Sequence, residues 1–169
     1  MRLGDVANGD AQQYGKPLEG VRILAAEQMQ ALPYATQLLA RLGAEVVKVE
    51  HPTAGESGRG AQPAMTDPEG RPVGATFLRN NLNKRSVGID LKHPRGRELF
   101  IELAAKFDIV GENFKAGTMD KLGFGADALA RLNPRLICVS HKGFLPGPYE
   151  HRTALDEVVL VSVRTPDRL

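Results

Sequence analysis

The stretch "VRILAAEQMQALPYATQLLARLGAEVVKVE", residues 21–50, decides the fold class. Residues 21–26 and 44–50 are short, mostly apolar runs typical of buried strands. Between them Pro33 suits the first turn of a helix, and Gly43 suits its end. That helix places four apolar side chains on one face: Tyr34, Leu38, Leu39 and Leu42. A strand–helix–strand unit of this length predicts parallel strands.

The rest of the chain continues the alternation. Residues 51–76 are rich in Gly, Pro and small polar residues, which predicts a long loop. Residues 93–107 predict an amphipathic helix, with these side chains inward: Leu99, Phe100, Leu103 and Phe107. Strands are expected at 108–111 and 135–140, with a pair of short helices at 117–132. Four or five such repeats predict an α/β fold with a doubly wound parallel sheet and flanking helices.

We expect three regions along the 169 residues. Residues 1–17 show no periodicity and predict a flexible leader. Residues 18–160 form the α/β domain. Residues 161–169 form an atypical polar tail, where the last strand or helix stops without a terminating element.

The composition excludes several classes of protein. Apolar residues make up 42% and charged residues 25%, which is typical of a globular chain. The net charge of +2 is too small to suggest a nucleic acid partner. No apolar run is long enough to span a membrane and no signal peptide is recognisable, so a cytoplasmic location is expected. Cys138, the single cysteine, is expected to be a buried, inert thiol, and the four histidines show no metal-ligand spacing.

Cations recur just after the predicted strands. In an open α/β sheet ligands bind beyond the carboxyl ends of the strands, so these positions form the candidate ligand edge. The cations there are His51, Arg59, Lys84, Arg85, Lys115, Lys121 and Lys142. They suit a ligand with several phosphates, although scattered surface charge remains the alternative. Gln30, beside the first helix, either holds a ligand or merely caps that helix.

Familiar phosphate-binding motifs are lacking. The sequence has no G-x-G-x-x-G after the first strand and no G-x-x-x-x-G-K-[ST], so a plain dinucleotide or P-loop site is not expected.

Five segments in order carry a family resemblance. They are "PYATQLLARLGAEVVKVEHP", "NKRSVGIDLKHPRGRELF", "ENFKAGTMDKLGF", "LNPRLICVSHKGFLPGPY" and "ALDEVV". Together they resemble the N-terminal part of the family III CoA-transferases, the group of formyl-CoA transferase and carnitine CoA-transferase, from about Leu18 to Val159. The resemblance implies a Rossmann-like CoA-binding domain and a homodimer of two interlocked chains. It also implies transfer of coenzyme A from an acyl-CoA donor to a carboxylic acid, with coenzyme A as a substrate rather than a resident cofactor.

The resemblance also implies site residues. Carried over by position, the CoA contacts are Gln30, Ala31, His51, Ile89, Asp90, Leu91, Lys92, Asn113, Phe114, Lys115, Lys121, Thr153, Ala154, Leu155 and Asp156. Lys84 and Arg85 are expected to shape this site, directly or by fixing the loop that follows. His51 and Lys121 stand where many relatives have Arg, which predicts a weaker or differently protonated phosphate grip.

No catalytic residue is assigned. The family mechanism uses a nucleophilic Asp, which the resemblance puts beyond the last residue of this chain, and Asp167 comes too early. The chain is therefore expected to be an N-terminal fragment, and an inactive CoA-binding fragment is one alternative function. An acyl-CoA racemase of the same superfamily is another, but its acid/base His would stand at Leu155, which cannot exchange protons.

Overall fold

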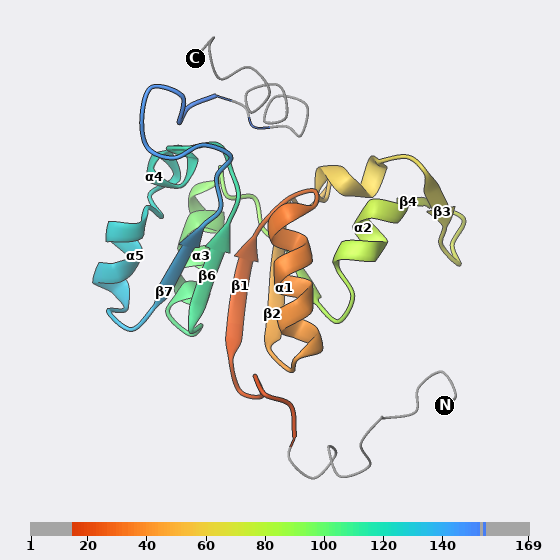
Figure 1. Ribbon diagram of the computed structural model, residues 1–169, viewed down its shortest axis with the longest axis horizontal. Coiled ribbons are helices and arrows are strands. Elements are labelled where there is room, and N and C mark those ends of the chain that lie inside the picture. The colour runs from red at the N-terminus through yellow and green to blue at the C-terminus, as the bar shows by residue number, and fades with distance from the viewer. Residues whose placement is uncertain (1–14, 153, 155–169) are drawn as a thin grey trace.

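The computed structural model describes residues 15–152 and residue 154, which form a layered α/β domain (Figure 1). Its main sheet has five strands, all parallel, in the order β5-β2-β1-β6-β7. The strands are β1 (Arg22–Ala26), β2 (Glu45–Glu50), β5 (Arg85–Gly88), β6 (Ile109–Glu112) and β7 (Ile137–Ser140). This arrangement confirms the predicted doubly wound fold.

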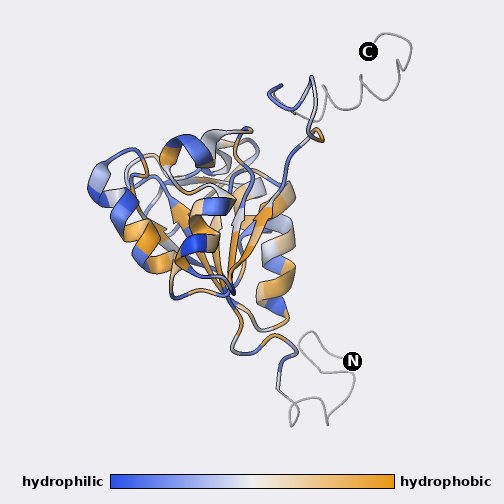
Figure 2. Cartoon of the chain, turned by 90° about the vertical axis from the view of Figure 1, so that its left-hand side faces the viewer, coloured by the Kyte–Doolittle hydropathy of each residue, from blue (hydrophilic) through white to orange (hydrophobic). Residues whose placement is uncertain are grey.

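Helices cover both faces of the sheet. Helix α1 (Ala31–Arg41) lies on one face, and α3 (Pro94–Ala104), α4 (Thr118–Leu122) and α5 (Ala126–Leu132) lie on the other (Figure 1). Hydrophobic residues dominate the strands of the sheet in Figure 2, although β2 also carries the buried Lys48. A parallel sheet needs this pattern, because its crossover helices bury both faces.

Two apolar clusters hold these layers together. On the α1 face Ile23 and Val46 pack with Ala40 of the helix. On the other face the ring of Phe100 lies 4.5 Å from that of Phe124, centroid to centroid, and both are buried. Phe100 and Phe107 therefore face the core as predicted, whereas Leu99 is 37% exposed.

Of the four apolar side chains predicted to face inward on helix α1, Leu39 packs against the core and the other three do not. Tyr34, Leu38 and Leu42 are exposed by 53%, 40% and 46%. The helix instead buries Leu32, Pro33, Thr36, Gln37 and Ala40. Thr36 and Gln37 are buried because each has a polar partner: Thr36 donates to Glu27, and the Gln37 side chain accepts from the Leu82 backbone N–H.

The predicted loop at 51–76 contains regular structure. It holds a 3-10 helix, η2 (Ser57–Gly60), and a hairpin of β3 (Ala64–Thr66) and β4 (Pro72–Gly74) that leads into α2 (Ala75–Asn80). The hairpin turn is closed by Asp67, whose carboxylate accepts from both the backbone and the side chain of Arg71. The prediction of a long loop missed this hairpin because both strands are only three residues long.

Two further expectations can be compared with the described residues. Cys138 is exposed rather than buried, because β7 is the edge strand of the sheet. No helix in the described part of the chain is long and apolar enough to cross a bilayer. The predicted leader and the tail at 161–169 fall largely or wholly outside the described residues.

Candidate functional site

The strand order reverses between β1 and β6, and the loops that follow these two strands meet at the carboxyl edge of the sheet. One side chain joins them. The Asn113 amide Nδ2 donates to the Gln28 carbonyl over 2.9 Å, and its Oδ1 accepts from the Gln28 backbone N–H over 2.8 Å. In doubly wound folds this reversal point is where ligands bind.

A glutamate stands at or just after the carboxyl end of each of three neighbouring strands. These glutamates are Glu27, Glu50 and Glu112, and each is buried. Each pairs with a cation from a later segment: Lys84, Arg59 and Lys142 respectively. The edge that was expected to present cations to a ligand is therefore lined by internal ion pairs.

The first pair is the most deeply buried. The Lys84 side chain is 2% exposed, and its Nζ donates to Glu27 Oε1 over 2.6 Å, to the Pro33 carbonyl over 2.7 Å and to Asn81 Oδ1 over 3.0 Å. Burial lowers the pKa of Lys84 to about 8, although the charge and hydrogen bond of Glu27 act in the opposite direction. All three N–H donors of the ammonium group are occupied by protein oxygens.

Lys48 adds a second buried ammonium beside the first. Its Nζ lies 3.6 Å from Glu27 Oε1 and 3.7 Å from Glu56 Oε2, and it donates to the Glu27 carbonyl. Two carboxylates and two ammonium groups are thus enclosed together. Charges are rarely buried in this way unless they are paired, because leaving water is costly for each of them.

The second pair fixes the segment after β2. Arg59 Nε donates to Glu50 Oε2 over 2.6 Å and Arg59 Nη2 donates to Glu50 Oε1 over 2.8 Å, so the contact is forked. Burial alone would raise the pKa of Glu50, but hydrogen bonds from Arg59, Ser86 and the Glu56 backbone outweigh it and lower the pKa to about 2. The Arg59 guanidinium also lies 3.8 Å from the centroid of the Phe77 ring.

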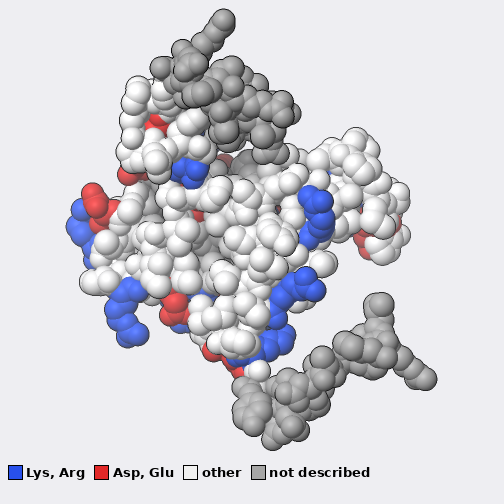
Figure 3. Space-filling view, in the orientation of Figure 1, with Lys and Arg blue, Asp and Glu red and all other residues white. Residues whose placement is uncertain are grey.

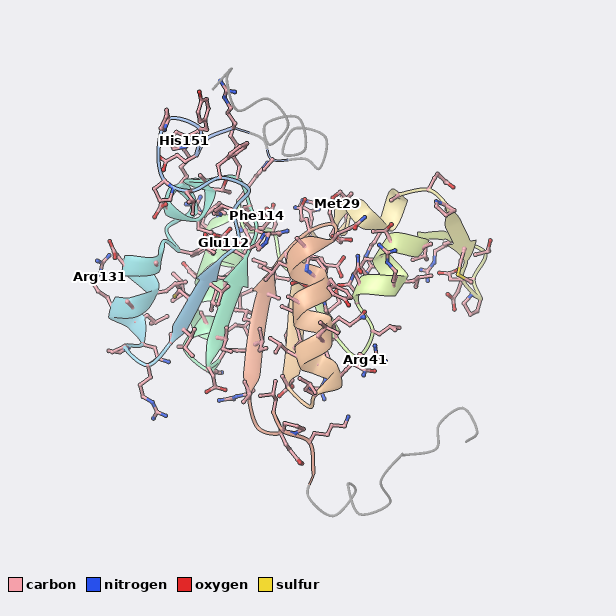
Figure 4. The ribbon with its side chains drawn as sticks, in the orientation of Figure 1. Met29, Arg41, Glu112, Phe114, Arg131 and His151 are labelled. Carbon is pink, nitrogen blue, oxygen red and sulfur yellow. The ribbon has the colours of Figure 1, made fainter. Side chains whose placement is uncertain are left out.

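The third pair fixes the segment after β6. Lys142 Nζ donates to both carboxylate oxygens of Glu112, over 2.6 and 2.7 Å, and to the Phe114 carbonyl. Ser140 also donates to Glu112, and the Phe114 backbone N–H donates to the same carboxylate. Figure 4 shows Glu112 and Phe114 side by side at this edge, with Met29 above α1.

The loop between β1 and α1 is held from several elements. Met29 has a positive φ of 64°, an unfavourable conformation for a side chain of its size. Its backbone N–H donates to Glu56 Oε2 over 2.8 Å, and its carbonyl accepts from Asn80. Glu56 Oε1 is buried and has no hydrogen-bond partner among the described residues. Strained backbone held this firmly is typical of a functional loop.

Beyond this loop, α1 begins without a side-chain cap at Gln30. Its first-turn N–H groups can therefore attract an anion. A cavity of about 330 Å³ lies here, lined by Gln30, Ala31, Tyr34, Arg79 and Asn80. The guanidinium of Arg79 is 3.5 Å from Gln30 Oε1.

Most of the predicted CoA contacts within the described residues share this edge. Exposed ones are Gln30, Ala31, His51, Lys92, Lys115, Lys121 and Ala154, whereas Asp90, Leu91, Asn113 and Phe114 are half-buried and Ile89 is buried. The imidazole Nδ1 of His51 accepts from the backbone N–H groups of Thr53 and Ala54, so it closes a turn. Thr153, Leu155 and Asp156 lie outside the described residues.

The two adjacent cations of "NKRSV" separate. Lys84 points into the interior, and its ammonium group bonds Glu27, Pro33 and Asn81 rather than the loop after β5 that it was expected to fix. Arg85 begins β5 and pairs with Glu45, the first residue of β2, so its guanidinium lies toward the opposite, amino-terminal edge. A direct contact between Arg85 and a ligand at the carboxyl edge is therefore not compatible with this structure.

Sequence reasoning missed the carboxylates and Lys48. Lys48 lies within an apolar strand that was predicted to be buried, and a lysine in such a place requires a carboxylate partner. The glutamates that end "AAE", "KVE" and "VGE" were the matching signal. Figure 3 shows Lys and Arg side chains spread over the face it presents, with no single patch.

The strand order and the clamped loop at its reversal point define a doubly wound α/β domain whose candidate ligand site lies at the carboxyl edge. Residues 18–163 match the family model described as CoA-transferase family III. The chain belongs to this family.

Curated relatives of this chain are also named as CoA-transferases. The chain is 44% identical over 135 residues to a formyl-CoA:oxalate CoA-transferase of Bradyrhizobium sp. (strain ORS 278), a match that covers 80% of this chain and 31% of the relative. It is 42% identical over 137 residues to the beta subunit of a succinyl-CoA–L-malate CoA-transferase of Chloroflexus aurantiacus, of which it covers 33%. The chain therefore spans about a third of the length of these relatives.

Solved structures show the same fold. A CAIB/BAIF family protein from Brucella suis has a TM-score of 0.79 at 39% identity, over 85% of this chain and 38% of that one. The protein Rv3272 from Mycobacterium tuberculosis has a TM-score of 0.79 at 38% identity, over 92% of this chain and 42% of that one.

Proposed function

We propose that this chain supplies the CoA-binding part of a transferase that moves coenzyme A from an acyl-CoA donor to a carboxylic acid. The observation that supports it most is the loop at residues 28–30, which side chains from several elements hold at the reversal point of the sheet. Relatives named as CoA-transferases share 42–44% identity with this chain.

The charges at this edge suit a phosphate-bearing ligand. Lys92 follows β5, Lys115 follows β6, and Lys121 lies on α4 just after it. All three are exposed, and none of them forms an ion pair within residues 15–152. Ammonium groups that lack a protein partner can bind the phosphates of coenzyme A, whereas those of Lys84 and Lys142 are already bound to carboxylates.

The chemistry we propose is covalent. A nucleophilic Asp carboxylate attacks the acyl-CoA thioester and releases the CoA thiolate, forming a mixed anhydride. The thiolate then attacks the aspartyl carbonyl, which releases the donor acid and leaves an aspartyl-CoA thioester. None of the described residues is assigned to the nucleophile. The role proposed for this chain is to bind and orient the CoA moiety beside the 28–30 loop.

We further propose that the assembled protein is a cytoplasmic homodimer. Exposed apolar side chains gather on α1, where Tyr34, Leu38 and Leu42 follow one another along the helix. On β7, Ile137 and Val139 are exposed by 57% and 42%. Apolar surface of this kind is typical of regions covered in an assembly.

Calorimetric titration of the chain with acetyl-CoA tests the binding proposal. We expect saturable binding that weakens about tenfold in Lys121→Ala, because a charged contact to phosphate is lost. Lys106→Ala is the matched control, because Lys106 is exposed and lies at the opposite edge, just before β6. No binding at millimolar acetyl-CoA, in a chain that unfolds cooperatively, would contradict the proposal.

A separate assay tests transfer. The chain is mixed with an acyl-CoA and an acceptor acid, and the products are separated by chromatography. Because no described residue is assigned as the nucleophile, we expect binding without exchange from this chain alone. Exchange would exclude the alternative of an inactive CoA-binding fragment.

A further inference from the structure

We propose that Lys84 is a positioning residue, whose ammonium group holds the loop at residues 28–30 in its ligand-binding conformation. The inference rests on the proposed function of that loop. Lys84 donates on one side to Glu27, which precedes the loop, and on the other to the carbonyl of Pro33, in the first turn of α1. One buried group therefore ties both ends of the segment that carries Gln30.

The hydrogen bonds of Lys84 connect segments that are distant in the sequence. Lys84 precedes β5 and is 57 positions from Glu27. Its third N–H donates to Asn81, the C-cap residue that follows α2, so the ammonium group also links the loop to the end of that helix. The loop itself is strained at Met29, and a strained segment keeps its shape only where surrounding contacts enforce it.

The positive charge of Lys84 contributes to holding the loop. The charged groups that face Lys84 are Glu27 from the end of β1, Lys48 from β2 and Glu56 from the segment that follows β2. With Lys84 charged, this enclosed set contains two positive and two negative groups. With Lys84 neutral, one carboxylate loses its counter-charge in a site without water access, and the hydrogen bonds to Glu27 weaken.

This arrangement couples the loop to pH. Burial brings the pKa of Lys84 down to about 8, so its charge is lost just above neutrality. The loop is then expected to be held firmly at pH 7 and loosely at pH 9. Ligand affinity falls in the same interval.

The experiment measures acetyl-CoA affinity of the 169-residue chain from pH 6.5 to pH 9.5. Acetyl-CoA serves as the probe because its sulfur is acylated and does not titrate. For the wild type we expect affinity to fall about tenfold as pH rises through 8, the ratio that one lost charged hydrogen bond produces. Lys84→Met is expected to bind weakly at every pH, near the level of the wild type at pH 9. Lys106→Met, a matched change at an exposed lysine, should keep the wild-type profile.

A second readout needs no ligand. The Met29 backbone N–H donates to Glu56, and its hydrogen exchange reports whether the loop is held. At pH 7 we expect strong protection in the wild type and in Lys106→Met, and at least tenfold less in Lys84→Met. Should Lys84→Met fail to fold, the wild-type protection factor at pH 7 and pH 9 gives the same comparison.

The outcomes separate the two proposals. Absence of acetyl-CoA binding, with Met29 protection that depends on Lys84, removes the proposed ligand but keeps the positioning role. Acetyl-CoA binding with the same pH profile in Lys84→Met and wild type overturns the positioning role. Unchanged Met29 protection in Lys84→Met overturns it as well.

Discussion

Glu50→Gln should lower the free energy of unfolding at neutral pH. It should also remove the part of the loss of stability in acid that comes from protonation of Glu50. The Glu50 side chain is 3% exposed. Its carboxylate accepts four hydrogen bonds: two from Arg59, one from Ser86 and one from the Glu56 backbone. Glutamine keeps the shape of this side chain. It loses the charge and replaces one acceptor oxygen with a donor that faces other donors.

The magnitude follows from the pKa. The hydrogen bonds overcome the effect of burial and lower the pKa of Glu50 from 4.5 to about 2, a difference worth about 3 kcal/mol. Because the folded-state pKa is the lower one, this stabilisation is complete above pH 4.5 and disappears as pH falls toward 2. By pH 3 about half of it should be lost.

Urea unfolding at several pH values provides the measurement. At pH 7 we expect Glu50→Gln to lower the free energy of unfolding by about 3 kcal/mol, and at pH 3 by about half as much. Glu98→Gln is the matched control, because Glu98 forms an exposed pair with Arg95 on α3 and should change stability by less than about 0.5 kcal/mol. A wild-type-to-variant gap that stays constant from pH 7 to pH 3 would refute the reasoning.

Three other substitutions test the remaining contacts. Asn113→Ala removes both hydrogen bonds across the reversal point and should lower the free energy of unfolding in urea by about 1–2 kcal/mol. It should also weaken acetyl-CoA binding. Unchanged affinity would argue against a ligand role for this loop. Gly96→Ala would force a methyl group into a steric clash with the Asp90 backbone carbonyl and should cost about 1–3 kcal/mol. Gly60→Ala, where a Cβ meets nothing, should change stability by less than about 1 kcal/mol. Equal melting temperatures for those two variants would contradict the packing seen at the start of α3. Arg59→Lys keeps the charge but loses the forked geometry and the ring contact, so we expect a loss of about 1–2 kcal/mol, checked by thermal unfolding.

The main-sheet strands and their parallel direction were predictable from the sequence. β1 and β2 are short apolar runs, and the helix between them has the spacing that a parallel crossover requires. The hairpin of β3 and β4 was not predictable in this way, because three-residue strands show no periodicity.

The predicted orientation of α1 was wrong for another reason than short strand length. Its strongest apolar stripe, at Tyr34, Leu38 and Leu42, is the outward one. Thr36 and Gln37 face inward because the edge beneath them is polar, and that polarity comes from Glu27 and from the Leu82 backbone. A periodicity argument assumes an apolar partner surface, which this end of the sheet does not offer.

The cations illustrate the same limit, and their placement narrows the candidate site. Sequence alone cannot show whether a lysine near the ligand edge serves a ligand or a buried carboxylate, because the partner is remote: Lys142 and Glu112 are 30 positions apart. Once the cations paired with buried glutamates are set aside, Lys92, Lys115 and Lys121 remain exposed at this edge, together with His51. The exposed lysines follow β5 and β6, on both sides of the clamped 28–30 loop in the strand order. A ligand that touched all of them would have to cross the reversal point of the sheet, as an extended molecule with phosphates at one end and a reactive group at the other can do.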